Sequence, residues 1–571
     1  MATRVTTWTE ITAPAGTESL AADDGANKRI TPNTLRNYIR QEVTTLTAAA
    51  IQEAINSVSS QGGGIVQLVS GVYILGATGI EVKSNVTLRG AGRDCTILRA
   101  TAIVSVGFHA GAIATLGATN AGIENLQVDL KTNSIPTNGI TFTGATSYTD
   151  SNTSQDCWVD RCTIKGYDQG TSPTGYHIWN RHAKGTRITN NIVDGDADGA
   201  AVYEPASGQE GIEVFGGTDV LVSGNVVKRC GNAGLFLTLE GESNLVNERI
   251  TFTNNHVESC RRGIYITAGL SAGGVNYFLD GCVISNNQVV DCYEAGITIY
   301  QGTAMVAPSD AVLVNLIISN NTVKIGPSVS GASDNRCVEF DKQVSSGTAK
   351  NFIFTGNTLV GGIANNGSIF ELNRWNDVLI SNNSFNCNSY AANYALFFLN
   401  ASNIQFKGNV LKDINKSAMN INGCSNGVFD GNSFVNIQNI GGLHTIYLNG
   451  DSDYCKFTNN ISEHSTGARF VNDNANSNNT YYLANTYINA HTFAQVSSNG
   501  GGNFGSVTIA GGSTSQATSN ELCLPDSDVF VHVRQKSGPL ENFSVTQIDG
   551  SFTVTRETAN ASPATYQYKI I

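Results

Sequence analysis

Between residues 191 and 460, apolar and polar residues alternate in one short phrase that returns every 23 to 36 residues. Each copy holds an apolar residue, a spacer, Gly-Asn or Asn-Asn, a second spacer and another apolar residue, as in VSGNVV and ISNNTV. The second residue of each pair is an asparagine, at Asn191, Asn225, Asn255, Asn287, Asn321, Asn357, Asn383, Asn409, Asn432 and Asn460. A fixed phrase with a variable period is typical of a repeat architecture rather than of a globular domain.

Each phrase has the two-residue period of a β-strand, and most copies are followed by a second alternating run such as GIYIT or GITIY. No segment of helical period lies between them that is long enough to cross a sheet. The strands are therefore expected to stack as a parallel β-helix, with coils about 4.8 Å apart. Asparagine tolerates the left-handed turn conformation, and its amide can bond to the asparagine of the next coil. The pattern predicts an all-β solenoid with an asparagine ladder.

The cysteines keep the phase of the repeat. Cys230, Cys260 and Cys292 each lie five residues after a ladder asparagine, whereas Cys157 and Cys282 lie at strand starts. Such columns are typical of small apolar side chains buried in a core. The N-terminus has no apolar segment of a secretory signal, so we expect the 12 cysteines to be free thiols of a chain made in a reducing cytoplasm.

Composition narrows the classes of function. A chain of 571 residues with 60 glycines and only 14% charged residues suits a turn-rich β protein. The net charge of -12 argues against a nucleic-acid track, and no apolar run approaches the roughly 18 residues of a membrane span. The cysteines lack CxxC pairing of the metal-binding type, so neither a metal nor a cofactor is expected.

Three regions are expected along the chain. Residues 1–45 read as a turn, a short strand and a helix that begins near Thr31, and they form a head segment. Residues 46–500 form the solenoid, which opens with an amphipathic helix in AIQEAINSVSSQ that can close its open end. Residues 501–571 alternate in FSVTQI and YQYKI and predict a small C-terminal antiparallel β-module.

The opening of the solenoid carries a family resemblance. IQEAI, GGG, GVYIL, SNVTLRGAG and TIL resemble the opening of pectate-lyase-like right-handed β-helix proteins, and the resemblance covers roughly residues 48–480. It implies a right-handed parallel β-helix solenoid with an N-terminal capping helix and a polysaccharide ligand. It supplies no catalytic motif, because members of this family use different residues on different faces.

Both ends of the chain resemble parts of bacteriophage tailspikes. KRIT followed by LRNYI resembles the head segments that dock tail spikes to the virion, and GSFTVTRETANASPATYQYKII resembles their terminal modules. With the β-helix shaft between them, the chain is similar to a tailspike. The resemblance implies a homotrimer, held to the virion baseplate or tail by its N-terminal segment, that is made in the host cytoplasm and acts outside on a bacterial surface polysaccharide.

In the second strand of each coil the apolar side chains are expected to point inward and the others outward. The first outward column then reads His177, Glu213, Phe236, Tyr265, Thr298, Glu339, Glu371, Phe398, Asn420 and Tyr447, and the next includes Trp179, Tyr300 and Asp341. A solvated sheet face more often shows Thr, Ser and Lys. The aromatic and carboxylate side chains here indicate a carbohydrate groove.

The main candidate site is formed by Glu339, Asp341 and Glu371. Glu339 and Asp341 lie two residues apart on one strand, and Glu371 is expected one coil above Glu339, at about 4.8 Å. Stacked carboxylates repel, which raises the pKa of one of them and gives the acid and base that glycoside hydrolysis needs. Arg374 and Trp375 follow, as a donor to the substrate and a stacking plate for a sugar ring. The alternative is that these are ordinary solvated carboxylates.

A second polar cluster also fits substrate binding, acid–base work or a lyase. Its members are His177, Trp179, Arg181, His182, Glu204, Glu210 and Glu213. The alternative interpretation is ordinary loop polarity.

Asp194, Asp196 and Asp198 precede a glycine, as at the start of a calcium-binding loop. The position that then needs a glutamate holds Pro205, so we expect a tight turn there rather than a metal site.

The sequence thus predicts a trimeric tailspike that binds and hydrolyses a capsule or O-antigen polysaccharide. Glu339, Asp341 and Glu371 are the catalytic candidates, and the substrate-binding candidates are Tyr265, Tyr300, Arg374, Trp375, His177, Trp179 and Glu213. Two alternatives stay open. One is a polysaccharide lyase, with a base such as His177 or Tyr265 and a cation such as Arg181 or Arg374. The other is an adhesin that binds without cleaving.

Overall fold

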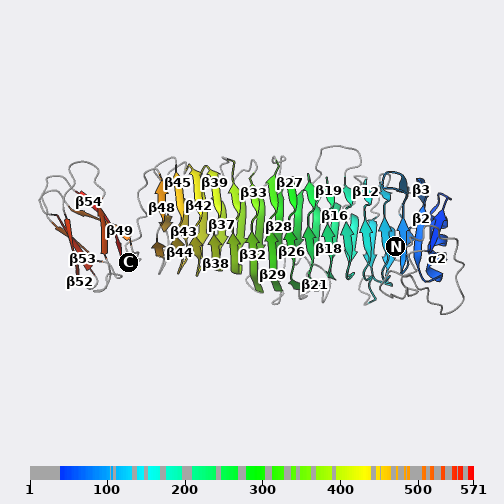
Figure 1. Cartoon of the computed structure of the whole chain (residues 1–571), viewed down its shortest axis with the longest axis horizontal. Helices are drawn as coiled ribbons and strands as arrows, with labels where there is room; N and C mark the ends of the chain where they lie inside the picture. The colour runs from blue at the N-terminus through cyan, green and yellow to red at the C-terminus, as the bar shows by residue number, and fades with distance from the viewer. Residues whose placement is uncertain are drawn as a thin grey trace, which may run out of the picture.

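The computed structural model shows a long right-handed parallel β-helix (Figure 1), as the sequence predicts. The structure describes residues 39–102, 104–106, 111–130, 138–146, 152–166, 175–195, 209–238, 246–267, 278–301, 312–326, 336–342, 348–361, 368–388, 394–438, 445–450, 452–464, 471–473, 481–483 and 485–488, and six strands between residues 504 and 570.

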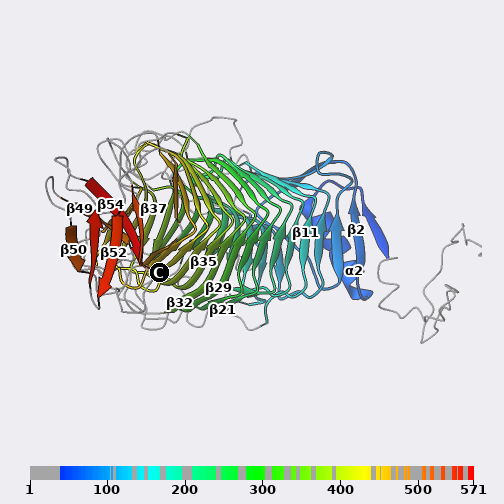
Figure 2. The same cartoon turned by 60° about the vertical axis from the view of Figure 1, so that its left-hand side comes forward.

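Three parallel sheets of 19, 14 and 15 strands form the walls of the solenoid and are named here sheets I, II and III. Figure 2 shows their strands stacked coil upon coil. Sheet I contains β1 (Arg40–Val43), β2 (Gly64–Leu68), β5 (Val86–Arg89), β8 (Gly122–Glu124), β11 (Trp158–Asp160), β14 (Arg187–Thr189), β17 (Gly217–Thr218), β18 (Leu221–Ser223), β21 (Val246–Glu248), β22 (Thr251–Thr253), β25 (Phe278–Asp280), β26 (Val283–Ser285), β29 (Val312–Ser319), β32 (Thr348–Thr355), β35 (Asn376–Ser381), β38 (Ser402–Lys407), β41 (Val428–Asp430), β44 (Lys456–Thr458) and β47 (Tyr481–Leu483).

Sheet II, which carries the candidate site, follows sheet III along each coil. Sheet II contains β4 (Ile80–Glu81), β7 (Gly111–Leu116), β10 (Asn138–Thr143), β13 (Gly175–Arg181), β16 (Gln209–Phe215), β20 (Ala233–Thr238), β24 (Arg262–Thr267), β28 (Ala295–Gln301), β31 (Arg336–Lys342), β34 (Phe370–Asn373), β37 (Tyr394–Leu399), β40 (Ser417–Asn422), β43 (Ile446–Asn449) and β46 (Val471–Asp473). Sheet III contains β3 (Gly71–Leu75), β6 (Thr96–Ala100), β9 (Gln127–Asp129), β12 (Thr163–Lys165), β15 (Ile192–Asp194), β19 (Val226–Lys228), β23 (His256–Glu258), β27 (Gln288–Cys292), β30 (Thr322–Ile325), β33 (Thr358–Val360), β36 (Ser384–Asn386), β39 (Val410–Ile414), β42 (Ser433–Ile437), β45 (Ile461–His464) and β48 (Thr486–Ile488).

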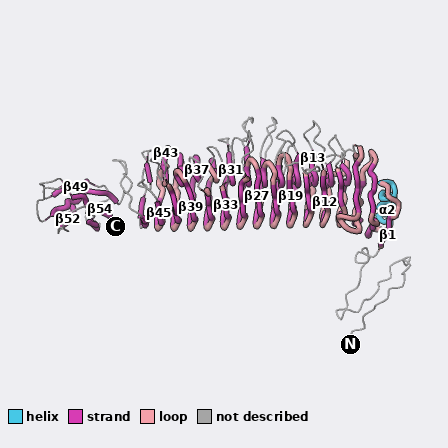
Figure 3. The backbone as a smooth tube through the Cα atoms, turned by 90° about the horizontal axis from the view of Figure 1, so that it is seen from above, coloured by secondary structure: helices cyan, strands magenta, loops and turns pink. Residues whose placement is uncertain are grey.

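The helix α2 (Ala48–Ser60) lies at the N-terminal end of the solenoid (Figure 3). Thr47 begins it as the N-cap, and its hydroxyl oxygen accepts a hydrogen bond from the backbone N–H of Ala50 at 3.3 Å. Ile51 and Ile55 on its inner face are fully buried against the first coils. The helix therefore shields the apolar interior from solvent, which confirms the predicted cap.

The first coil begins earlier than the expected end of the head segment. β1 pairs in parallel with β2, and Val43 lies in register with Leu68. The helix predicted near Thr31, and with it most of the head segment, lies outside the described residues.

The predicted asparagine ladder is present and buried. The backbone N–H and the side-chain amide of Asn321 both donate to Oδ1 of Asn357 at 2.9 Å, and the amide also donates to the carbonyl of Ile284 at 2.9 Å. Asn287 donates to Asn321 in the same way. This pattern repeats from Asn191 to Asn460 and ends on Asn485, so each buried amide is satisfied by its neighbours in the stack.

One detail of the ladder differs from the prediction. The left-handed conformation belongs to the residue before each ladder asparagine, such as Asn320 with φ of 55° and Gly356 with φ of 67°. Only glycine and asparagine among common residues enter this region at low cost. This requirement explains why the first residue of the repeated pair alternates between the two types, while the second must carry the ladder amide.

The cysteines are unbridged, as predicted, for the eleven that the structure describes; Cys523 lies outside the described residues. Ten of the eleven are buried in the solenoid, and Cys95 is exposed. Burial raises the pKa of Cys282 and of Cys337 to about 12, so both thiols stay protonated at neutral pH.

The C-terminal region contains antiparallel strands, in contrast to the parallel solenoid. Two three-stranded sheets are present, one of β49 (Phe504–Ile509), β54 (Ala564–Ile570) and β51 (Val529–Val533), and the other of β50 (Ser515–Ser519), β53 (Ser551–Arg556) and β52 (Phe543–Ile548).

Candidate functional site

One column of side chains on the outer face of sheet II, named here the outer column, carries the candidate chemistry. Its members occupy equivalent positions in consecutive coils and are Trp179, Glu213, Phe236, Tyr265, Thr298, Glu339, Glu371, Phe397, Asn420 and Tyr447. Glu339 and Glu371 are direct neighbours in register, so the predicted stacking of these two carboxylates is confirmed.

The predicted column is wrong at its first coil. Trp179, not His177, lies in register with Glu213, because Ile178 pairs with Ile212. His177 is fully buried, and its Nδ1 lies 2.9 Å from the carbonyl oxygen of Glu210. Burial lowers the pKa of His177 and favours a neutral ring inside the wall.

The predicted column also slips at β37. Phe397 is the neighbour of Glu371, whereas Phe398 points into the core and is fully buried. The slip arises because the run ALFFL is apolar at every position and gives no alternation from which to fix the face.

Arg336, at the start of β31, joins the two stacked carboxylates. Its Nη1 lies 2.5 Å from Oε1 of Glu339 and 2.9 Å from Oε2 of Glu371. The three side chains are 14–19% exposed, so water reaches them while their contacts stay partly shielded. The sequence analysis considered only the repulsion between the carboxylates and missed this shared cation. The signal for it was an arginine three residues before Glu339 on the same strand.

Asp341, the third predicted acid, lies on the same strand as Glu339. Its backbone is in register with Tyr300 of the preceding coil and with Asn373 of the next. The side chains of Asp341 and Tyr300 lie outside the described part of the structure, so their roles stay predictions.

The two residues predicted after Glu371 part company. Arg374 adopts a left-handed conformation with φ of 61°, which turns the chain at the end of β34. Trp375 then points into the core, where it is 1% exposed and its ring centroid lies 5.3 Å from that of Phe352. Trp375 is therefore not placed to stack on a sugar, and its predicted role as a surface plate is corrected.

Tyr265 lies in the outer column but is covered. Its ring stacks on Phe236 at 5.0 Å, and the Arg262 guanidinium lies 4.6 Å from its centroid on the ring face. Tyr265 is only 6% exposed. Arg262 and Arg261 both bind the carboxylate of Glu294, so this stretch of the face is held together by its own contacts.

The second predicted cluster is brought together mainly by packing. Trp179 stacks on Tyr176 at 4.6 Å and is 5% exposed, and the Arg181 guanidinium lies 4.8 Å from its ring centroid. Glu213 is 1% exposed and accepts a hydrogen bond from the Thr238 hydroxyl at 2.5 Å. These contacts give the cluster a structural role beside any contact with a ligand.

Two other predicted members contribute in different ways. His182 meets Phe215 edge to face, with 5.8 Å between ring centroids. Glu204 lies outside the described residues.

The predicted tight turn after β15 is described only at its start. Asp194 binds Arg229 at 2.6 Å and Lys228 at 3.4 Å, so its carboxylate is already neutralised by cations. Asp196, Asp198 and Pro205 lie outside the described residues. Within the described part of the chain, no helix is long and apolar enough to cross a membrane.

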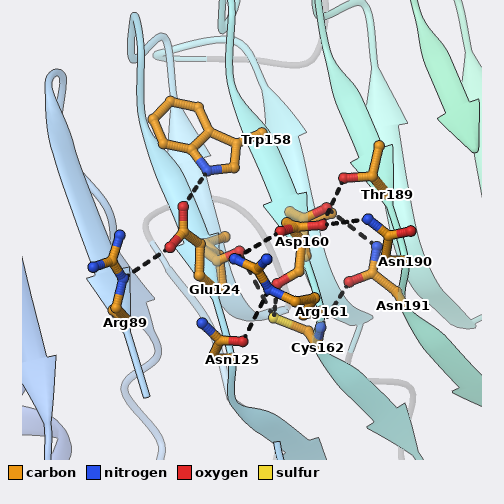
Figure 4. Close-up of polar contacts among 12 residues, drawn as sticks. Arg89, Glu124, Asn125, Trp158, Asp160, Arg161, Cys162, Thr189, Asn190 and Asn191 are labelled. Atoms are coloured by element: carbon orange, nitrogen blue, oxygen red, sulfur yellow. Dashed lines mark hydrogen bonds and ion pairs between the residues drawn. The ribbon is translucent and has the colours of Figure 1, made fainter. Parts of the chain in front are cut away.

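A carboxylate on sheet I has a similar environment and offers a comparison with the candidate site. Glu124 accepts hydrogen bonds from Arg89 at 2.8 Å and from the indole N–H of Trp158 at 2.9 Å (Figure 4). Its side chain is 12% exposed. Glu124 therefore resembles Glu371 in burial and in its arginine contact, but no second carboxylate of Figure 4 shares that arginine.

Sequence comparison identifies a family over part of the chain. A family model described as rhamnogalacturonase A/epimerase, pectate lyase-like, matches residues 42–298. This segment runs from β1 into β28 and ends before the carboxylate pair. No curated protein matches the chain. The chain thus carries a pectate-lyase-like domain, as its sequence predicts.

Solved structures with similar folds act on or bind glycans, according to their descriptions. A mutant tailspike protein of E. coli bacteriophage HK620 in complex with a pentasaccharide has a TM-score of 0.50 and 13% identity, covering 93% of this chain and 90% of that one. An exopolygalacturonase from Thermotoga maritima has a TM-score of 0.39 and 11% identity, covering 63% and 88%. The A-module of the mannuronan C-5 epimerase AlgE4 from Azotobacter vinelandii has a TM-score of 0.38 and 15% identity, covering 79% and 95%. At these identities the likeness supports the β-helix fold alone.

Proposed function

We propose that the chain is a phage tailspike that binds and cleaves a bacterial surface polysaccharide, either capsule or O-antigen, by hydrolysis of internal glycosidic bonds. The observation that carries the proposal is the stacked pair Glu339 and Glu371, which lies on the outer face of sheet II and shares one nitrogen of Arg336. The fold that the chain shares with a pentasaccharide-bound tailspike supports the choice of ligand class.

Hydrolysis of a glycosidic bond needs one carboxyl group that gives a proton and one carboxylate that takes a proton. In the proposed reaction one member of the pair protonates the bridging oxygen while the bond from that oxygen to the sugar carbon breaks. The other member removes a proton from the water that attacks this carbon, so a sugar hydroxyl forms on each product. Asp341 is a further acid candidate, two residues along the strand from Glu339. Arg336 holds the two carboxylates in place.

The same face is less suited to a lyase. Elimination from a uronate needs an accessible base and a cation that neutralises the sugar carboxylate. Of the bases considered, His177 is fully buried and Tyr265 lies beneath Arg262. The cation nearest to the pair, Arg336, is bound by both carboxylates. These contacts favour hydrolysis over elimination.

Assembly and location follow from the same proposal. A tailspike is expected to be a homotrimer, attached to the virion baseplate or tail through residues 1–45 and acting outside the bacterium. Light scattering on the purified chain tests the trimer, because a particle of about the 60.4 kDa chain mass would contradict it.

The enzyme activity is tested with a panel of purified O-antigen and capsular polysaccharides. Polymer size, new reducing ends and ultraviolet absorption of unsaturated sugars are followed with the wild-type chain. Hydrolysis yields shorter chains and reducing ends without the ultraviolet signal, a lyase yields that signal, and an adhesin binds a polymer without shortening it.

Variants then assign the site. Glu339→Gln, Asp341→Asn and Glu371→Gln are each expected to lower turnover by about 10²–10⁴-fold, the usual contribution of a positioned acid or base. Glu124→Gln is the matched control, since Glu124 has similar burial and an arginine partner on another sheet. Normal cleavage by the three site variants, together with loss of cleavage in Glu213→Gln, would place the chemistry in the second cluster instead.

A further inference from the structure

Three aromatic residues lie immediately beyond the carboxylate pair on the C-terminal side and were not predicted as a site. Phe397 is in register with Glu371, and Tyr447 follows it two coils later in the outer column. Tyr394 begins the same strand as Phe397. All three are partly exposed, unlike Phe398, which is buried in the core.

The three rings form a corner rather than a closed stack. The rings of Tyr394 and Phe397 are inclined by only 21°, with 6.4 Å between centroids. The ring of Tyr447 stands at 80° to that of Tyr394, with 5.9 Å between centroids. These separations leave ring faces turned in two directions, in contrast to Phe236 and Tyr265, whose rings lie parallel at 5.0 Å under Arg262.

The polar surroundings of the corner suit a sugar. Asn420 lies between Phe397 and Tyr447 in the outer column and accepts a hydrogen bond from Asn449 at 2.8 Å. Amide groups between aromatic rings match sugar units, which present apolar C–H faces to rings and hydroxyl groups to amides. The span from Glu371 to Tyr447 is three coils, or about 14 Å, which is long enough for more than one sugar unit.

We infer that Tyr394, Phe397 and Tyr447 form the principal substrate-binding subsite, and that the polysaccharide extends from the carboxylate pair toward the C-terminal end of the solenoid. This inference rests on the proposed function and adds a direction to it. Toward the N-terminal end, the neighbours of Glu339 in the outer column are Thr298 and Tyr265, which are 1% and 6% exposed. That side offers little open ring surface to a sugar.

The test measures binding of the same polysaccharide panel, printed as an array, to Glu371→Gln chains that turn over slowly. Phe397→Ala and Tyr447→Ala, each added to Glu371→Gln, are expected to weaken binding of the recognised polymer by roughly tenfold, the size of one aromatic stacking contact. Phe397→Leu keeps side-chain bulk and is expected to fall between the two. The control is Tyr454→Asn, which removes a tyrosine that is 52% exposed outside sheet II and keeps a residue type that tolerates its φ of 57°.

The outcomes separate this inference from the proposed function. A polymer bound equally by the Phe397, Tyr447 and control variants would overturn the aromatic subsite and leave hydrolysis standing. A polymer that is bound but never shortened by the wild-type chain would overturn hydrolysis, and weaker binding by the Phe397 variants would still support the subsite. A folded chain that binds no member of the panel would overturn both. Melting temperatures of all variants, expected within a few degrees of wild type, identify any variant that loses binding by unfolding.

Discussion

The asparagine turn and the outer column of sheet II show two different uses of the same repeat. At the turn every coil has the same buried asparagine with the same three donor contacts, from Asn191 to Asn460. In the outer column consecutive coils place a threonine, two glutamates, a phenylalanine and an asparagine at equivalent positions. A repeated buried contact stabilises the stack as a whole, whereas a varied surface column can carry local chemistry.

The sharpest way to break this comparison is to remove the cation of the outer column. Arg336→Gln leaves Glu339 and Glu371 without the nitrogen that both contact, so they are expected to move apart. Turnover of the polysaccharide should fall by about 10²-fold or more, because acid–base catalysis depends on the position of both groups. Initial rates of reducing-end release measure this.

The control for Arg336 is the arginine of Figure 4. Arg89→Gln removes a similar contact to Glu124 on sheet I and should leave turnover unchanged. Partial recovery of rate in Arg336→Lys would support a role in positioning. Equal rates for Arg336→Gln and wild type would show that the two glutamates act without their shared partner.

A single change at the turn is expected to have the opposite profile. Asn321→Ala deprives Asn287 of its acceptor, and it removes the donors to Ile284 and Asn357. Each buried group left unpaired costs about 1–3 kcal/mol, so we expect a loss of about 2–4 kcal/mol in the free energy of unfolding. Urea denaturation followed by circular dichroism measures the loss, while the activity of the folded fraction should be unchanged.

The exposed side of the solenoid provides the matched control. Asn351 donates to Asn315 at 3.0 Å in an exposed row of amides, and its φ is 58°. Asn351→Asp keeps a residue that tolerates this conformation and should change the free energy of unfolding by less than about 0.5 kcal/mol. A similar loss in both variants would mean that burial of the ladder does not determine its contribution.

Alkaline pH is expected to weaken the repeated core and not the surface column. Burial raises the pKa of Cys157 to about 11 and of Cys162 and Cys282 to about 12, above the value of an exposed thiol. Between pH 9 and pH 12 the unfolded chain gives up these protons first, so stability that is fully present below pH 9 is lost as the pH rises. Each such thiol should contribute about 1 kcal/mol of this loss by pH 10.

Urea midpoints at pH 8 and pH 10 under reducing conditions measure this effect. Cys282→Ala removes one of the titrating thiols and should show a smaller shift than wild type. Identical shifts in the two proteins would argue against a role for this thiol in the alkaline loss.

The smallest expected effect is the labelling of native thiols. Cys95 is the exposed cysteine among the described residues, and the other ten described are buried. A thiol reagent should therefore label Cys95 quickly in the folded chain and the remaining described thiols only after denaturant is added. Cys95→Ser should remove the fast phase, apart from any contribution of Cys523. Fast labelling of several core thiols would contradict the packed interior.

The sequence by itself determined the features that repeat. The Gly-Asn and Asn-Asn pairs predicted the strands, the ladder and the buried cysteines, because a solenoid imposes the same environment on equivalent positions in every coil. The stacking of Glu339 and Glu371 followed from the same register. The helix cap followed from an amphipathic segment next to a glycine-rich turn.

Only the tertiary structure decided what happens where the pattern breaks. The run ALFFL has no polar residue to mark its outer face, so the pairing of β34 with β37 selected Phe397 over Phe398 as the neighbour of Glu371. Trp375 entered the core because Arg374 turns the chain just before it. Alternation in sequence assigns a face only while it lasts, and contacts between coils decide the rest. The guanidinium of Arg336 reached both carboxylates for the same reason, since stacking brought Glu371, 35 residues away in the chain, beside its own strand.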